Sequence, residues 1–465
     1  MPELPEVQTV LDTLSLQIKD AKIKDIKILF EKIIEDDPDL FKQKLTGQHF
    51  RAFKRRGKYL LFEMDDLTLV CHLRMEGKFF IFDGEGITGR HDHVVFYLDD
   101  GRSLHYNDVR KFGRMYLTEK KQRYVKFRDL GPEPFWNSFN KQYCKNYLSR
   151  RQTPIKEVLL DQSFVAGIGN IYADEILFAS RINPLEKACR LNDDQIAKII
   201  RNTRTILNKA IAAGGTTIRS YTSSLGVTGL FQMSLRAHDQ KKCPRCKKDI
   251  VKIRIGGRGT YYCPRCQKLK KKIAVSGSIG SGKSMVCAHL RERGFDVFDC
   301  DETNRRLLEP GEKGYLAIEK AFPMCFEDGK LDKKKLSSIV FENEEEKKKL
   351  EGIMHPLILE KMFERKDDPL FAEVPLLFEA NWDIYFDETL LVVTDETLLL
   401  ERLVLRGLSR EEAIARLKNQ MSVAEKIKRA DKIIYNNGSL EDLYKLVDDW
   451  LEDILCWEKT FTKLK

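Results

Sequence analysis

The chain has 465 residues, 42% of them hydrophobic and 10% aromatic, which is the composition of an ordinary globular protein with room for two to four domains. No stretch approaches 18 consecutive apolar residues, so the sequence argues against a transmembrane helix and a membrane partner. The net charge of +10 hides an asymmetry, because residues 1–270 carry 49 basic and 32 acidic side chains and residues 271–465 carry 32 and 39. The basic part therefore predicts a polyanionic partner that the acidic part does not share, with a merely solvated surface as the alternative.

The N-terminus and the cysteines bear on the cellular compartment. The opening MPELPEVQTV is acidic and contains two prolines, unlike the basic start and apolar core of a signal peptide. Four of the eleven cysteines form two C-x-x-C pairs, and the other seven are scattered along the chain. This distribution suits a reducing compartment better than a disulfide framework, so we expect a cytoplasmic protein.

In chain order, strands come first and helices second. Residues 50–130 alternate apolar and polar side chains, as in KYLLFEM and HVVFYLDD, which predicts β-strands. From about 140 to 213 the apolar spacing becomes helical. GIGN at 167–170 indicates a tight turn before a helix, and the two glycines at 214–215 indicate a helix end.

The two cysteine pairs follow at 243–266, with the spacing C-x2-C-x16-C-x2-C. This spacing predicts a zinc site formed by Cys243, Cys246, Cys263 and Cys266, with a redox pair as the weaker alternative. Four thiolates leave no open coordination position, so the Zn²⁺ should be structural. Between the pairs, VKIRIGGRGTYY predicts a basic hairpin whose Gly-rich tip brings Arg258 toward a DNA backbone.

Only ten residues separate the last of these cysteines from a phosphate-binding loop. GSIGSGKS follows the short apolar strand IAVS, precedes a helical stretch and fits G-x-x-x-x-G-K-[ST]. This pattern predicts an ATP and Mg²⁺ site, in which backbone N–H groups cradle the phosphates, the lysine reaches the β/γ oxygens and the last serine holds the metal ion. The expected ATP-binding residues are Gly277, Ser278, Ile279, Gly280, Ser281, Gly282, Lys283 and Ser284. Strands FDVFDCD, FAEVPLLFE and ETLLVVT then alternate with helical segments, which predicts a parallel α/β sheet.

The first 268 residues resemble the formamidopyrimidine-DNA glycosylase family. The resemblance rests on MPELPEV at the start, RRGKYLLFE at 55–63, HLRMEG at 72–77, HDHV at 91–94, NDVRKFG at 107–113, LGPEP at 130–134, IKEVLLDQ at 155–162, GIGNIYADE at 167–175 and the cysteine pairs. It implies that Pro2, once the initiator methionine is removed, is the nucleophile and that Glu3 is the proton donor. The chemistry agrees, because a terminal secondary amine can attack a sugar C1′ and a carboxyl group can protonate the ring oxygen. The resemblance also implies proton-donor roles for Lys58 in β-elimination and for Arg258 in δ-elimination.

The same resemblance implies a set of DNA contacts. Met75, Arg110 and Phe112 would fill the gap left when a damaged base is flipped out of the duplex, although each alone would be an ordinary core or surface residue. His91, Arg151 and Asn170 would contact the phosphate backbone, the last at a helix N-terminus, which favours phosphate. Two segments depart from the family pattern: Val109 stands where proline is common, and LRAHDQKKC lacks the usual Tyr-Gly. The segment TIRSYTSSLGVTG corresponds to the loop that covers the lesion in this family.

Residues 272–450 resemble dephospho-CoA kinase. After the phosphate loop, the resemblance rests on VFDCD at 297–301, IMHPLI at 353–358, VPLLFE at 374–379, ERLVLRGLSREEA at 401–413, NQ at 419–420 and KRADKIIYNNGS at 428–439. It implies that Asp301 is the catalytic base for the ribose 3′-hydroxyl, and that Arg402 and Arg406 belong to a lid that offsets phosphoryl charge. Without the phosphate loop, the aspartates of VFDCD would be solvated carboxylates at a strand end. Ser278 replaces a glycine usual in this family.

The sequence therefore predicts a multidomain chain with α+β and α/β parts. We expect a β-sandwich over 1–135, a helix–two-turn–helix domain over 136–225, a zinc finger over 226–268 and a P-loop kinase domain with a parallel sheet over 272–465. The predicted partners are double-stranded DNA with oxidised bases, ATP and dephospho-CoA. The alternatives are an endonuclease VIII-like glycosylase for oxidised pyrimidines, another small-molecule P-loop kinase, and a non-catalytic DNA-binding protein with a regulatory nucleotide domain.

Overall fold

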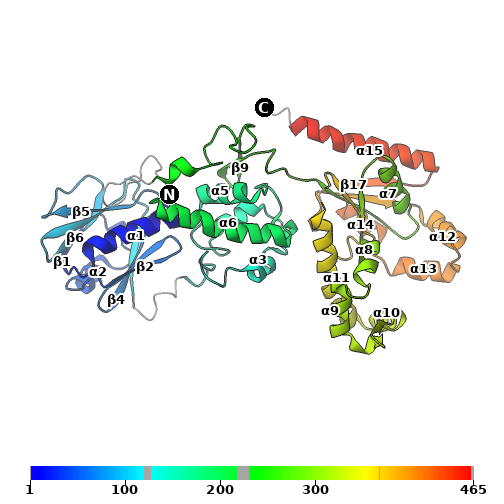
Figure 1. Cartoon of the computed structure of the whole chain (residues 1–465), viewed down its shortest axis with the longest axis horizontal. Coiled ribbons are helices and arrows are strands. Elements are labelled where there is room, and N and C mark those ends of the chain that lie inside the picture. Colours follow the sequence, from blue (N-terminus) through cyan, green and yellow to red (C-terminus); the bar gives the residue numbers. More distant parts are fainter. Residues whose placement is uncertain (1, 120–126, 217–229, 366, 462–465) are drawn as a thin grey trace. The chain divides into compact units, whose positions relative to one another are not determined.

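The computed structural model describes residues 2–119, 127–216, 230–365 and 367–461. The chain forms two compact units, Met1–Leu269 and Lys270–Lys465, and Figure 1 labels many of their elements. The segment 217–229, where we expect the lesion-covering loop, lies outside the described residues. Among the described helices, none combines the length and apolar character that crossing a membrane requires.

The first unit begins with helix α1 (Leu4–Ile18), which the strand and helix patterns did not predict. Glu3 and Glu6 form a capping box at its start, in which each side chain accepts a hydrogen bond from the other residue's backbone N–H. Proline occupies the first turn, where its missing N–H has no helical partner to lose. The apolar side chains of α1 recur at helical spacing and are buried on one face.

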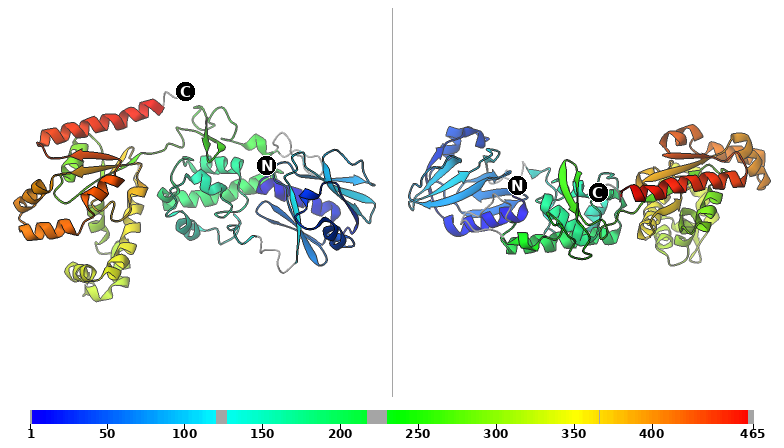
Figure 2. Two further views of the ribbon diagram at one scale, coloured as in Figure 1. Left: turned by 180° about the vertical axis from the view of Figure 1, so that it is seen from behind. Right: turned by 90° about the horizontal axis from the view of Figure 1, so that it is seen from above.

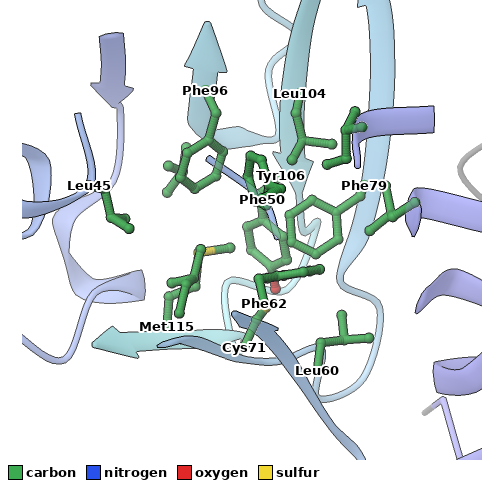
Figure 3. Packing of buried hydrophobic residues seen from close by; sticks show 14 of the residues in the cluster. Leu45, Phe50, Leu60, Phe62, Cys71, Phe79, Phe96, Leu104, Tyr106 and Met115 are labelled. Atoms are coloured by element: carbon green, nitrogen blue, oxygen red, sulfur yellow. The ribbon is translucent and has the colours of Figure 1, made fainter. Parts of the chain in front are cut away.

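Two four-stranded antiparallel sheets enclose the first core. One sheet has the order β1-β6-β7-β5 and the other β2-β3-β4-β8. The buried aromatic rings of Phe50, Phe62, Phe79, Phe96 and Tyr106 meet between the sheets, as Figure 3 shows. This arrangement confirms the predicted β-sandwich. The elements are β1 (Ile23–Ile28), α2 (Pro38–Leu45), β2 (Ala52–Arg56), β3 (Tyr59–Glu63), β4 (Leu67–His72), β5 (Lys78–Asp83), β6 (Asp92–Leu98), β7 (Arg102–Asn107) and β8 (Arg114–Glu119), with a 3₁₀ turn at Glu31–Ile33.

Four helices form the second core of this unit. They are α3 (Lys141–Leu148), α4 (Ile155–Leu160), α5 (Asn170–Ser180) and α6 (Asp193–Ala212), with short 3₁₀ turns at Ala188–Arg190 and Phe231–Ser234. The predicted end of α6 is confirmed, because Gly214 and Gly215 follow it with φ of 74° and 79°, a conformation that favours glycine. A two-stranded hairpin of β9 (Val251–Ile255) and β10 (Arg258–Tyr262) then separates the cysteine pairs, as expected.

The second unit contains a five-stranded sheet of order β12-β15-β11-β16-β17, in which every neighbouring pair is parallel. Helix α15, drawn in red in Figure 2, lies beside α7 and β17. The parallel α/β prediction is confirmed. The elements are β11 (Lys272–Gly277), α7 (Lys283–Glu292), β12 (Val297–Asp299), α8 (Cys300–Leu307), α9 (Lys313–Ala321), β13 (Phe326–Glu327), β14 (Lys330–Leu331), α10 (Lys333–Glu342), α11 (Glu344–Glu364), β15 (Leu370–Glu373), β16 (Glu388–Val393), α12 (Glu396–Leu405), α13 (Arg410–Lys418), α14 (Val423–Arg429), β17 (Lys432–Tyr435) and α15 (Leu440–Phe461), with 3₁₀ turns at Pro323–Cys325 and Asp383–Tyr385.

Two local expectations in this unit were wrong, and one strand was missed. The expected strand FAEVPLLFE ends at Glu373, before the proline of VPLL, whose missing N–H cannot extend a sheet ladder. Strand β17 has only four residues and was not predicted. Asp301 does not end a strand: β12 stops at Asp299, which caps α8 by accepting a hydrogen bond from Glu302 N at 2.9 Å, so Asp301 lies in the first turn of that helix.

Candidate active sites

A cavity of about 660 Å³ lies in the first unit, where the β-sandwich, the start of α5 and the β9–β10 hairpin meet. Five of the residues singled out from the sequence line it, namely Glu3, Lys58, Met75, Asn170 and Arg258. Pro2 is buried and directly precedes Glu3. The remaining wall is mixed, with His72, Arg74, His238 and Asp239 among its polar members. The fold thus brings into one cavity residues that are up to 255 positions apart in the sequence.

Glu3 is held at the N-terminus of α5. Its carboxylate accepts hydrogen bonds from Ile171 N at 3.0 Å and from Tyr172 N at 3.4 Å. Gly169 makes this approach possible, because a Cβ there would lie 2.5 Å from Glu3 Oε1 and 2.6 Å from its Cγ. Burial raises the pKa of Glu3 above its usual value, against the opposing effect of the nearby Lys58 ammonium. The raised pKa keeps this carboxyl group protonated to a higher pH than usual, which favours a role as proton donor.

Lys58 occupies the two-residue turn between β2 and β3. Gly57 beside it has φ of 56°, and Gly57 N donates to Glu133 Oε1 at 2.6 Å. Arg56 also binds Glu133, at 3.0 Å, so one buried carboxylate fixes the start of the turn. Burial lowers the pKa of Lys58, while the carboxylates of Glu3 and Glu6 act against that shift. The Lys58 amine and the Glu3 carboxyl group therefore lie near each other on the cavity wall, and both are largely shielded from water.

The expected wedge residues lie on two turns of the β-sandwich, and Met75 is partly buried on the first of them. Arg110 and Phe112 share the turn between β7 and β8, where the guanidinium lies 5.0 Å from the Phe112 ring. Asp108 organises this turn, because its buried carboxylate accepts hydrogen bonds from the N–H groups of Arg110, Phe112 and Gly113 at 2.8–3.0 Å. Phe112 is 48% exposed, although an apolar ring normally avoids water, and it is therefore available to a partner.

The expected backbone contacts differ in their surroundings. His91 is partly buried and its carbonyl accepts from Asp108 N at 3.0 Å. Arg151 is exposed and its guanidinium lies 4.7 Å from the ring of Tyr147, outside the cavity wall. Asn170 begins α5 and donates from Nδ2 to Gly259 O at 2.9 Å, which ties the β9–β10 hairpin to this helix. Asn170 thus holds the neighbouring Arg258 strand at the cavity edge.

The four cysteines of the finger meet the requirement for a tetrahedral metal site. Their sulfur atoms all lie within 4.8 Å of one another, and Cys246 and Cys263 are 3.4 Å apart. Zn–S bonds of about 2.3 Å in a tetrahedron place the sulfurs about 3.8 Å apart, so the cluster fits Zn²⁺ with little adjustment. The finger packs on α5 and on the residues just after it: Arg245 donates to Phe178 O at 2.8 Å, and Gln267 donates to Ile182 O at 2.8 Å. A bound Zn²⁺ would therefore stabilise the hairpin that carries Arg258.

The phosphate loop of the second unit joins β11 to α7. Gly280 and Gly282 have φ of 82° and 97°, which L side chains rarely adopt. A Cβ at Gly277 would lie 2.7 Å from Val392 O, and a Cβ at Gly282 would overlap the amide of Asn436. Asn436 Nδ2 in turn donates to Ser281 O at 2.8 Å, which links the loop to the end of β17. Ser278 and Ser281 are buried, whereas Lys283 and Ser284 at the start of α7 remain accessible to a ligand.

Carboxylates gather beside this loop. Glu373, at the end of β15, accepts a hydrogen bond from Ser284 Oγ at 2.8 Å, although the sequence analysis did not select it. Desolvation, followed by the neighbouring Asp299 carboxylate, raises the pKa of Asp301, while Lys283 opposes the shift. Such a shift favours a group that accepts a proton during catalysis.

The two expected lid arginines lie at the end of α12. Arg402 donates to Thr394 Oγ1 at 3.3 Å and to Asn436 O at 3.2 Å, so it is anchored next to the phosphate loop. Arg406 caps the helix and is exposed. Gln420, from the NQ motif, accepts from Ile279 N at 3.3 Å. The site therefore draws on segments at or just after the carboxyl ends of all five strands of the parallel sheet.

Comparison with known proteins accounts for the first unit in three parts. Residues 1–115 match the formamidopyrimidine-DNA glycosylase N-terminal domain, residues 130–222 the formamidopyrimidine-DNA glycosylase H2TH domain, and residues 240–269 a zinc finger found in FPG and IleRS. The formamidopyrimidine-DNA glycosylases of Oceanobacillus iheyensis and Ligilactobacillus salivarius are 44% and 46% identical over 267 residues, which make up 56% of this chain and 95% and 97% of those proteins. The chain belongs to the formamidopyrimidine-DNA glycosylase family.

Solved structures of this glycosylase family show the same architecture. A complex of Lactococcus lactis Fpg with DNA containing an abasic site aligns with a TM-score of 0.55 at 38% identity, covering 57% of this chain and all of that protein. A complex of the same wild-type enzyme with DNA containing N7-benzyl-Fapy-dG aligns equally well over 58% of this chain. Residues 272–442 match the dephospho-CoA kinase family model. Both predicted resemblances are confirmed, as is the zinc prediction.

Some residues of the glycosylase-family site escaped the sequence analysis. Glu6 accepts hydrogen bonds from Tyr172 Oη at 2.6 Å and from Thr216 N at 2.8 Å, which ties α1 to α5 and to the end of the helical domain. Asp174 is fully buried, forms an ion pair with Lys156, and accepts from His238 Nδ1 at 2.7 Å. The repeated glutamates of PELPEV were a capping-box signal for Glu6. No local signal marked Asp174 or His238, because their partners are distant in the sequence.

Proposed function

We propose that the first unit excises oxidised purines, such as formamidopyrimidines and 8-oxoguanine, from double-stranded DNA and then cleaves the abasic strand. The observation that carries this proposal is the Glu3 carboxyl group, buried beside Lys58 on the wall of the cavity and adjacent in sequence to Pro2. Family membership and relatives solved with damaged DNA support it. Division of the unit into domains over 1–135, 136–225 and 226–268 belongs to the same proposal.

The proposed reaction starts at Pro2. Removal of Met1 frees a secondary amine, whose lone pair attacks C1′ of the damaged nucleotide while the N-glycosidic bond breaks and the base leaves with its electron pair. Glu3 protonates the ring oxygen, the sugar opens, and an iminium ion joins Pro2 to C1′. Lys58 and Arg258 then assist departure of the 3′ and 5′ phosphates in β- and δ-elimination. Each of these side chains except Pro2 lines the cavity.

DNA recognition in this proposal uses the two turns that carry the expected wedge residues. Met75, Arg110 and Phe112 enter the duplex in place of the flipped nucleotide, and His91, Arg151 and Asn170 contact the backbone. Basic side chains outnumber acidic ones by 17 over residues 1–270, which favours approach to a polyanion.

Trapping with borohydride tests the glycosylase proposal. Borohydride reduces an iminium ion to a stable amine, so the full chain should become covalently attached to a duplex with 8-oxoguanine opposite cytosine, and Pro2→Gly should abolish the adduct. Preference for thymine glycol opposite adenine would favour the endonuclease VIII-like alternative. Absence of any adduct from the unaltered protein would favour a non-catalytic DNA-binding role.

We also propose that the second unit transfers the γ-phosphoryl group of ATP to the 3′-hydroxyl of dephospho-CoA. The supporting observation is the phosphate loop flanked by Glu373 and Asp301, within residues that match the kinase family. Asp301 accepts the hydroxyl proton, Lys283 contacts the phosphates, and Ser284 with Glu373 would hold Mg²⁺, which supplies charge neutralisation at the β and γ oxygens. Arg402 and Arg406 offset charge on the transferred group.

Phosphate transfer to dephospho-CoA, compared with AMP and shikimate, tests this second proposal. Transfer to AMP or shikimate instead would assign another small-molecule kinase. Lys283→Ala should abolish transfer without changing DNA excision, and Pro2→Gly should do the reverse. Loss of both activities from either change would contradict a chain with two independent chemistries.

A further inference from the structure

Met75 and the Arg110–Phe112 pair lie on different turns, but the two turns converge on one buried side chain. Met75 belongs to the turn 73–77 between β4 and β5, and Arg110 and Phe112 belong to the turn 108–113 between β7 and β8. Gly77 and Gly113 are the last residues of these turns. Each glycine lies directly against the hydroxyl end of Tyr106.

The closeness of this contact explains why both positions are glycine. A Cβ added at Gly113 would overlap the Tyr106 hydroxyl and lie 2.7 Å from Cζ. A Cβ added at Gly77 would overlap the same hydroxyl and lie 2.7 Å from Leu73 O. Neither glycine has a positive φ, so a special backbone conformation is not the reason. At Gly113 the Tyr106 side chain alone fills the space above the Cα atom, and at Gly77 the phenol oxygen fills it together with the Leu73 carbonyl.

Tyr106 cannot move away to relieve such a contact. It is fully buried in β7, opposite Phe79 of β5 and Val94 of β6. Its ring centroid lies 5.2 Å from that of Phe79, within the aromatic core that Figure 3 shows. A buried ring between two sheets is closely packed on all sides. The phenol oxygen is therefore a fixed point, and the two turns close against it.

We propose that Tyr106 is a positioning residue that sets the spacing between Met75 on one turn and Arg110 and Phe112 on the other, so that the three side chains enter DNA as one rigid unit. The inference rests on the proposed excision of bases from duplex DNA. It assigns a role to the Tyr106 hydroxyl in particular, because a phenylalanine ring would fill the apolar core equally well. The oxygen is the one atom of the side chain that reaches both glycines most closely.

Tyr106→Phe tests the role of this oxygen, with Tyr97→Phe as the matched control. Tyr97 lies on the neighbouring strand β6, is only partly buried and does not line the cavity. The substrate is a duplex with 8-oxoguanine opposite cytosine and with 2-aminopurine next to the lesion, because 2-aminopurine fluorescence rises when the stack is opened. Gly113→Ala, which pushes one turn off the oxygen, is a second variant.

The expected result is a smaller 2-aminopurine signal and about a tenfold lower kcat/KM on the duplex for Tyr106→Phe, since misplacement of positioning groups by a fraction of an ångström is costly. Cleavage of a single-stranded oligonucleotide with a preformed abasic site, which needs no wedge, should be unchanged, as should the melting temperature. Gly113→Ala should lower the fluorescence signal further, and Tyr97→Phe should match the unaltered protein.

Two outcomes would overturn the inference. One is an unchanged 2-aminopurine signal in folded Tyr106→Phe and Gly113→Ala. The other is an equal loss of activity on duplex and single-stranded DNA, which would assign Tyr106 a purely structural role. Failure of the proposed function is distinguishable from both, because it would show as a missing borohydride adduct in the unaltered protein.

Discussion

The contact between Gly169 and Glu3 predicts that Gly169→Ala slows excision. Gly169 has φ of −129° and ψ of −163°, an extended conformation that any residue can adopt. Gly169→Ala therefore introduces no backbone strain, and its effect is steric. The new Cβ would lie 2.5 Å from Glu3 Oε1 and 2.6 Å from Cγ. Since non-bonded carbon contacts lie near 3.5 Å, the Glu3 carboxylate must move by about 1 Å.

A shift of this size should lower the rate of excision strongly and the free energy of unfolding moderately. Misplacement of a reacting group by about 1 Å lowers rates by about 10²-fold. Overpacking of a buried contact costs about 1–3 kcal/mol, and displacement also weakens the hydrogen bonds from Ile171 N and Tyr172 N to Glu3. We expect Gly169→Ala to remain folded and to excise 8-oxoguanine about 10²-fold more slowly.

Single-turnover excision, thermal melting and phosphate transfer measured on the same preparation would check this. The kinase activity is an internal reference, because Gly169 and the phosphate loop belong to different units. Gly89→Ala is the matched control, because the closest atom to its Cβ would be Asp92 Oδ2 at 3.4 Å, an ordinary contact. Excision by folded Gly169→Ala within about threefold of the unaltered protein would refute the assignment of Glu3 as a position-sensitive proton donor.

Three further changes have defined outcomes. Burial raises the pKa of Glu3, so the charged form of its carboxyl group destabilises the fold at neutral pH. Glu3→Gln should therefore melt at a higher temperature than the unaltered protein at pH 7–8, and this difference should shrink as the pH falls toward about 4. A melting-temperature difference that stays constant with pH would contradict the burial argument. Removing Zn²⁺ with a chelator, and then exchanging the protein into chelator-free buffer with Mg²⁺, should lower DNA affinity and the melting temperature of the first unit, because Cys243 and its partners pack against α5. The same treatment should leave phosphate transfer unchanged. Glu373→Gln should raise the Mg²⁺ concentration needed for half-maximal phosphate transfer by about tenfold, since one negative ligand is lost beside Ser284. An unchanged half-maximal Mg²⁺ concentration would place the metal ion elsewhere.

The sequence by itself determined the features that depend on local spacing. Two C-x-x-C pairs specify four convergent thiols, and G-x-x-x-x-G-K-S specifies a strand, a loop and a helix, because each pattern is built by residues a few positions apart. The motif order also indicated both families before any contact was known. The strands of the first unit, the parallel sheet and the helix boundary at Gly214 follow from apolar periodicity and glycine conformation in the same way, whereas the β-sandwich was implied by the family resemblance.

Tertiary structure alone decided how the candidate site is held. Glu3 meets the backbone of Ile171, and Asp174 meets His238, across separations of 168 and 64 residues. No local pattern encodes such pairs, because they depend on which surfaces the core brings together. Burial determines two further features. The pKa of Glu3 is raised because neighbouring elements exclude water from its carboxyl group. The glycines at 77 and 113 lie against the buried Tyr106 oxygen, which leaves no space for a Cβ atom at either position.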